Sequence, residues 1–163
     1  AIQIAKLAGA TVYTTVGSEG KVAKAKALGA DEVINYQRED FVQRIQALTD
    51  KHGVDVVFEH IGPATWEGSV RVLKKQGRLV TCGATSGPNV PLDLRYVFSR
   101  HLTILGSMMG TRAELLSVTQ LVAQRRLRPV IDTVYPLREA ATAQARLLNR
   151  DVFGKLLLCP ERP

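Results

Sequence analysis

The sequence predicts an α/β fold built on a parallel sheet, and three patterns support this prediction. Apolar stretches of strand length alternate with stretches of helical spacing along most of the chain, which is the pattern of βαβ units. Residues 54–58 are apolar on both faces except at Asp55, as in a strand that helices cover on both sides. A glycine turn at 17–21 joins a predicted strand to a predicted helix, as in half of a nucleotide-binding fold.

The predicted elements of this sheet follow one another at short intervals. Residues 1–7 are predicted to form the end of a helix. Strands are predicted at 11–16, 32–35, 54–58, 78–82 and 102–105, and helices between them at 22–28, 40–49 and 65–73. The helix at 40–49 begins at Asp40 and has Phe41, Val42, Ile45 and Leu48 at helical spacing, which predicts one apolar face.

The pattern changes beyond Gly106. Thr111 and Glu114 have the spacing of a capping box, which predicts a helix that extends to about residue 126 and ends before Pro129. A strand at about 132–135, a helix at about 138–148 and a strand at 155–159 complete the prediction. We place a domain boundary near Pro129, which divides the chain into residues 1–129 and 130–163.

Composition is that of an ordinary globular domain. The chain has 163 residues, of which 45% are hydrophobic and 23% are charged, enough for one sizeable core. No apolar stretch approaches the length of a membrane span and no signal peptide is visible, so the cytoplasm is the expected location. Cys82 and Cys159 have no metal or redox spacing, and each is predicted to be a small buried thiol.

The net charge of +7 does not by itself indicate a nucleic-acid partner. The basic residues are scattered except in two clusters, at 74–78 and 125–128. Both clusters are predicted at helix C-termini, where cations complement the helix dipole. No aromatic residues are interleaved with them, so we expect neither nucleic acid nor a membrane as a partner.

The turn after the predicted strand 11–16 indicates which nucleotide would bind. In dinucleotide-binding units, an Asp or Glu at this strand tip binds the 2′-hydroxyl of the adenosine ribose. The tip at 16–17 has no acid here, and Ser18, Lys21 and Tyr36 follow instead. A lysine and two hydroxyls suit a 2′-phosphate, and they predict a preference for NADP(H).

Two points weigh against this prediction. Glu19 would repel a phosphate unless its carboxylate points away. Taken singly, Lys21 is better interpreted as a solvated lysine in the first turn of a helix, and Tyr36 as a half-buried strand residue. The combination of both residues with Ser18 and the absent acid favours a binding role.

Several short motifs resemble, in the same order, the medium-chain dehydrogenase/reductase superfamily, in particular its quinone oxidoreductase and zinc-type alcohol dehydrogenase-like branches. The motifs that carry this resemblance are 1–6, 9–10, 17–21, 27–31, 35–36, 77–80, 106–107 and 153–155. They extend over nearly the whole chain. The resemblance implies a Rossmann-type doubly wound parallel sheet followed by a C-terminal piece of the catalytic domain.

The chain departs from this superfamily at its beginning. The glycine-rich pyrophosphate turn and the first strand would precede Ala1, as would the catalytic domain with its zinc ligands and substrate pocket. We therefore expect the C-terminal portion of a longer protein, with a sheet that lacks its first strand. Alone, this portion is expected to fold poorly, to bind dinucleotide weakly and to be inactive.

The resemblance also implies which residues contact the cofactor. Lys21 and Tyr36 match residues that hold the adenosine 2′-phosphate, and the loop at 59–62 would pass the nicotinamide ribose, with Glu59 where the family usually has Asp. Small residues after two further strands would line the nicotinamide end. The predicted cofactor-binding residues are Gly17, Ser18, Lys21, Tyr36, Ile61, Cys82, Gly83, Ala84, Thr85, Gly106, Ser107 and Met108. For the loop residues, the alternative is a purely structural role.

The function that the resemblance implies is an NADPH-dependent oxidoreductase, which transfers a hydride between nicotinamide and a carbonyl, alcohol, quinone or enone. No residue of the chain is predicted to be catalytic, and its histidines and cysteines are not spaced as a metal site; zinc is possible only in the missing N-terminal part. A homodimer through the edge strand 102–105 is expected. The alternative is a non-enzymatic nucleotide-binding or interaction module, because a fold does not guarantee activity.

Overall fold

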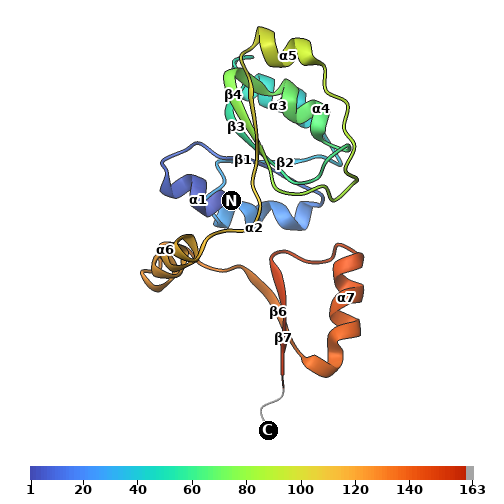
Figure 1. Cartoon of the computed structure of the whole chain (residues 1–163). Coiled ribbons are helices and arrows are strands. Elements are labelled where there is room, and N and C mark those ends of the chain that lie inside the picture. The colour runs from blue at the N-terminus through green and yellow to red at the C-terminus, as the bar shows by residue number, and fades with distance from the viewer. Residues whose placement is uncertain (161–163) are drawn as a thin grey trace. The chain divides into compact units, whose positions relative to one another are not determined.

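The computed structural model describes residues 1–160, and they divide into two compact units at Thr111–Arg112 (Figure 1). Each unit contains parallel strands joined through helices, so the predicted α/β class is confirmed. The division follows the last strand of the first unit. The assignment of residues 130–163 to a catalytic domain stays a prediction.

The first unit contains eleven elements in alternating order. They are α1 (Ile2–Leu7), β1 (Tyr13–Val16), η1 (Glu19–Lys21), α2 (Val22–Ala27), β2 (Glu32–Asn35), α3 (Phe41–Leu48), β3 (Val54–Glu59), α4 (Trp66–Arg71), β4 (Leu73–Thr81), α5 (Leu94–Ser99) and β5 (Thr103–Gly106). Of these, η1 is a single 3₁₀ turn and α5 was not predicted. All the predicted strands of this unit form, with boundaries that shift by a few residues.

The strands of this unit form two parallel groups. β1 pairs with β2, and β4 lies between β3 and β5. The edge position predicted for 102–105 is confirmed, because β5 pairs with β4 alone among the described residues. β1 and β3 likewise each have one edge without a partner strand in residues 1–160.

The core of the first unit consists of two apolar clusters that β3 joins. Leu73 and Leu79 are fully buried in one cluster and Ile34 in the other, while Val54 and Val57 of β3 pack against both. The helix predicted from Asp40 is confirmed in α3. Asp40 Oδ1 accepts hydrogen bonds from the amides of Val42 at 2.7 Å and Gln43 at 3.0 Å, and such a cap typically contributes about 1 kcal/mol.

The predicted helix at 65–73 was too long. α4 ends at Arg71 and β4 begins at Leu73, because the Val54 amide donates to the Val72 carbonyl at 2.9 Å and draws the chain into the sheet. The basic cluster 74–78 therefore lies in a strand and not at a helix C-terminus, and Lys74 pairs with Asp55 of β3.

Exposure corrects two further predictions. Val56 and Phe58 on one face of β3 are 47% and 54% exposed, so in residues 1–160 helices do not cover both faces of this strand. Cys82 and Cys159 are both exposed and not buried. Cys82 follows the end of β4 at Thr81 and lies in a loop, and Cys159 is the last residue of a strand in the second unit.

The second unit is a helix followed by one βαβ arrangement (Figure 1). Its elements are α6 (Arg112–Ala123), β6 (Ile131–Pro136), η2 (Leu137–Glu139), α7 (Ala140–Leu148) and β7 (Lys155–Cys159). β6 pairs in parallel with β7. The boundaries predicted for β7 are confirmed, whereas α6 ends three residues before the predicted position. No described helix of either unit is long and apolar enough to cross a bilayer.

Candidate functional site

The ends of β1 and β2 bring together two of the predicted adenosine-binding residues. The two strands are parallel neighbours, so their C-terminal ends lie at one edge. The Tyr36 amide donates to the Val16 carbonyl at 3.1 Å. The Tyr36 ring also lies against Gly17, where a methyl group would be 2.9 Å from Cζ. Gly17 therefore allows the phenol to lie across the tip of β1.

Ser18 and Lys21 occupy the turn directly after this tip. The Lys21 amide donates to the Ser18 carbonyl at 3.1 Å and closes η1. Ser18 is exposed, and Lys21 is half-buried at the start of α2. Tyr36 is 47% exposed, so the hydroxyls of Ser18 and Tyr36 are both accessible from solvent at this end of the strands.

A charged pair that the sequence did not predict lies at the same edge. The Glu19 carboxylate accepts a hydrogen bond from Asn35 Nδ2 at 3.3 Å and pairs with Arg38 Nη1 at 3.0 Å. Asn35 is buried at the end of β2 and also caps the following turn, since its Oδ1 accepts from the Gln37 amide. The only sequence signal for Arg38 was its place two residues after Tyr36.

The loops after β3 and β4 are hydrogen-bonded into one surface. The His60 carbonyl accepts from the Thr85 amide at 3.3 Å and from Thr85 Oγ1 at 2.9 Å. The Ile61 carbonyl accepts from the Ser86 amide at 2.7 Å and from Ser86 Oγ at 2.8 Å. A Cβ atom at Gly83 would lie 3.1 Å from the His60 carbonyl oxygen, so this glycine is needed for the close approach of the two loops.

Glu59 holds the loop after β3 in place through hydrogen bonds. It is 3% exposed, and its carboxylate accepts from the amides of Ile61 at 2.6 Å and Gly62 at 3.2 Å, as well as from the hydroxyls of Thr65 and Ser69 on or next to α4. Burial by itself raises the pKa of this carboxyl, but the hydrogen bonds, that of Ser69 foremost, outweigh burial and lower the pKa below its usual value.

The end of β5 adjoins the same surface. Thr81 of β4 is in register with Gly106 of β5, and the Ser107 amide donates to the Thr81 carbonyl at 2.9 Å. No atom lies within 4 Å of the position of a Cβ at Gly106. Met108, which follows Ser107, is 89% exposed. Ile61, Cys82, Gly83, Ala84 and Thr85 therefore share one end of the sheet with Gly106 and Ser107.

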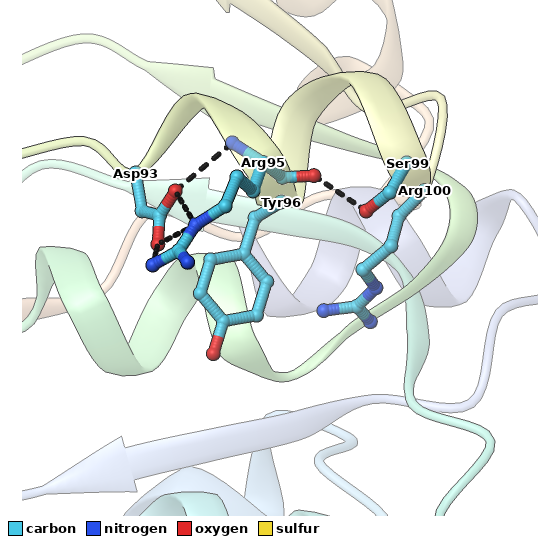
Figure 2. A pocket seen from close by; sticks show the side chains of 5 residues that line it. All are labelled: Asp93, Arg95, Tyr96, Ser99 and Arg100. Atoms are coloured by element: carbon cyan, nitrogen blue, oxygen red, sulfur yellow. Dashed lines mark hydrogen bonds and ion pairs between the residues drawn. The ribbon is translucent and has the colours of Figure 1, made fainter.

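A shallow hollow on α5 lies elsewhere (Figure 2). Its lining residues are Asp93, Arg95, Tyr96, Ser99 and Arg100. Asp93 pairs with Arg95 at 2.7 Å, which lowers the pKa of Asp93. Since α5 precedes β5 and the Arg100 carbonyl accepts from the Gln76 amide early in β4, this hollow is at the N-terminal end of the strands, away from the predicted cofactor loops.

The described residues do not fit a metal ion. Among residues 1–160, no three His, Cys, Asp or Glu side chains lie close enough to hold one. The exposed loops at the strand ends offer backbone groups, hydroxyls and cations instead, which are the groups that contact an anionic dinucleotide.

Comparison with known proteins identifies the family. The family of zinc-binding dehydrogenases matches residues 1–124. The chain belongs to this family, within the medium-chain dehydrogenase/reductase superfamily.

Relatives within the superfamily differ in their substrates. The chain is 33% identical over 171 residues to quinone oxidoreductase 1 of Escherichia coli, and the match covers 98% of this chain and 52% of that protein. It is 30% identical over 181 residues to crotonyl-CoA reductase of Streptomyces collinus, and this match covers 99% of this chain and 40% of that protein. The chain thus spans about half the length of the curated relatives that it matches.

Solved structures resemble the chain over almost its full length. One is an NAD-dependent alcohol dehydrogenase, which is 43% identical with a TM-score of 0.89, and the alignment covers 96% of this chain and 46% of that one. Another is the Escherichia coli quinone oxidoreductase in complex with NADPH, which is 32% identical with a TM-score of 0.85, with coverage of 98% and 52%. The names of these two structures include NAD in one case and NADPH in the other.

Proposed function

We propose that this chain is the cofactor-binding part of an NADPH-dependent oxidoreductase. The observation that carries the proposal is the convergence of Tyr36 on Gly17 at the tip of β1, next to Ser18 and Lys21 in the turn. No carboxylate stands at the tip itself, where it would accept the 2′-hydroxyl of an NADH ribose. Two hydroxyls and an ammonium group instead suit the 2′-phosphate of NADPH.

The nicotinamide end would lie along the loops after β3, β4 and β5. The cofactor supplies the hydride when bound. The residues of this chain would position the ring: the backbone of His60 and Ile61, hydrogen-bonded to Thr85 and Ser86, would lie on one side, and the open space at Gly106 leaves room beside it. The substrate, a carbonyl, alcohol, quinone or activated alkene, would approach from outside the described residues, which include no group that we assign to catalysis.

Lys21→Ala tests the proposal. A charge-assisted contact to phosphate contributes about 1.5–3 kcal/mol, so the native protein should lose about tenfold to a hundredfold in NADPH affinity. NADH affinity should change little, because NADH presents only a neutral hydroxyl at this position. Both cofactors are titrated at low salt against the wild type and the variant.

Lys26→Ala is the matched control, because it removes the same charge from an exposed position on α2. It should leave both affinities nearly unchanged. Equal losses of NADPH and NADH affinity in Lys21→Ala would show that the lysine supports the fold and does not contact the phosphate. A wild type that prefers NADH would overturn the cofactor assignment.

Two further parts of the proposal concern the whole protein. We propose a homodimer in which the free edge of β5 pairs with a second copy, since an apolar edge strand favours such pairing. The cytoplasmic location and the domain boundary near Pro129 stay predictions.

A further inference from the structure

The Glu19 carboxylate lies beside the proposed phosphate end of the cofactor site, because it bonds to residues on either side of Tyr36. It accepts from Asn35 Nδ2 at 3.3 Å and pairs with Arg38 Nη1 at 3.0 Å. Asn35 is the last residue of β2 and directly precedes Tyr36, and Arg38 lies in the turn that follows. The carboxylate is therefore held at the end of β2, and it links the turn that contains Lys21 to the turn that contains Arg38.

The charge balance at this edge depends on Arg38. A carboxylate near a phosphate repels it, and this repulsion opposes the attraction of Lys21. The ion pair with Arg38 cancels the charge of Glu19. A guanidinium also has five N–H donors, so the contact of Nη1 with Glu19 leaves donors for a second anion. The side chains of Arg38 and Glu19 are 69% and 59% exposed, which leaves the pair accessible to a ligand.

We propose that Arg38 is a specificity-determining residue for the 2′-phosphate of NADPH. It neutralises Glu19 and donates to the phosphate, so the pair Glu19–Arg38 sets the ratio of NADPH to NADH affinity. This inference rests on the proposed function. It adds Arg38 and Glu19 to the residues that choose the cofactor, and it explains how a turn that contains an acid can accept a phosphate.

The test is a double-mutant cycle on the native protein, with NADPH, NADH and adenosine 2′,5′-bisphosphate as ligands at low salt, where exposed charges are least screened. Arg38→Ala should weaken NADPH and adenosine 2′,5′-bisphosphate by about tenfold, because it removes a donor and leaves Glu19 unpaired. Glu19→Gln should strengthen both ligands by about threefold. In the double variant, the loss caused by Arg38→Ala should shrink to about threefold, because no carboxylate is left unpaired. NADH affinity should stay within about twofold throughout.

Arg71→Ala is the matched control. It removes the same charge, but Arg71 pairs with Glu67 within α4 at 3.8 Å and lies next to the start of β4, at the opposite end of the strands from the phosphate end, so the ratio of the two affinities should not change. Thermal melting checks that each variant folds. We expect folding to be retained, because the substituted side chains are exposed.

The outcomes separate this inference from the proposed function. Equal weakening of NADPH and NADH by Arg38→Ala, or an additive cycle in which Glu19→Gln has no effect, would overturn the role of the pair and leave the proposed function standing. A wild-type protein that binds neither NADPH nor adenosine 2′,5′-bisphosphate would overturn both.

Discussion

Gly17 and Tyr36 contact each other across the tips of two neighbouring strands, and this contact can be tested without changing any charge. A methyl group at Gly17 would collide with the Tyr36 ring. Because the ring is half exposed, it can swing outward, and we expect Gly17→Ala to cost less than about 1 kcal/mol of stability. The displaced phenol would no longer reach a phosphate, so NADPH affinity should fall by about tenfold.

Thermal melting and cofactor titration measure the two effects of Gly17→Ala separately. Gly20→Ala serves as the control, since no atom lies within 4 Å of its Cβ position and its backbone is not in the left-handed region. An equal loss of NADPH affinity in both variants would show that flexibility of the turn, and not the position of Tyr36, determines binding.

At the scale of elements, Glu59 joins the loop after β3 to α4. Glu59→Gln replaces a charged acceptor with an amide whose NH₂ group faces hydrogen-bond donors, and we expect a loss of about 2 kcal/mol in unfolding free energy. The amides of Ile61 and Gly62 should then exchange with deuterium faster. Folding lowers the pKa of Glu59. The stabilisation by the ionised Glu59 carboxylate is therefore fully present above the ordinary pKa of a glutamate, and it is lost as the pH falls from that value through the lowered pKa of the folded state.

The measurement is hydrogen exchange at the amides of Ile61 and Gly62 in Glu59→Gln, with Glu67→Gln as the control. Glu67 lies on α4, is 77% exposed and is 3.8 Å from Arg71, so its neutralisation should leave the loop unchanged. Unchanged exchange at Ile61 and Gly62 in Glu59→Gln would contradict the anchoring role of Glu59.

Asp132 of β6 bonds to α7 and to the turn before β7 in the second unit. It accepts from the Phe153 amide at 2.9 Å and from Thr133 Oγ1 at 2.7 Å, and it pairs with Arg146 at 3.0 Å. These contacts, that of Phe153 foremost, lower the pKa of Asp132 to about 2. A lowered pKa in the folded state stabilises at pH values above the unfolded pKa, so this contribution should be lost as the pH falls from about 4 to about 2.

Denaturant titrations between pH 2 and pH 7 measure this dependence. Asp132→Asn should be less stable than wild type at pH 7 and should lose the part of the acid sensitivity that Asp132 causes. Asp151→Asn is the control, because Asp151 is 85% exposed and 3.9 Å from Arg146. If the acid sensitivity of Asp132→Asn matched that of wild type, Asp132 would not be its source.

At the scale of the whole molecule, the edge of β5 predicts association. Thr103 and Leu105 are exposed on this edge strand, and a second copy could pair with it in antiparallel fashion about a two-fold axis. Thr103→Lys should weaken the dimer, because charged side chains block edge pairing. Light scattering of the native protein over a range of concentrations measures the association, with Gln43→Lys on the exposed face of α3 as the control. A wild type that is monomeric at high concentration would refute the prediction.

The sequence by itself determined the features that depend on local periodicity and local backbone chemistry. The alternation of strands and helices predicted the parallel α/β class. Asp40 predicted the start of α3, and the apolar stretch 155–159 predicted β7 with its boundaries. The glycine turn at 17–21 placed the candidate adenosine site at the end of β1. Neighbouring residues decide each of these features, so they are visible in the sequence.

Tertiary structure decided what depends on residues far apart in the chain. The pairing of Glu19 with Arg38, the hydrogen bonds that join the loop at 60–62 to Thr85 and Ser86, and the extension of β4 back to Leu73 all require contacts between separate elements. The exposure of Phe58 and Cys82 likewise depends on which surfaces the other elements cover. Periodicity shows that a side chain is apolar or charged, but only the fold brings it to the partner that covers it or balances its charge.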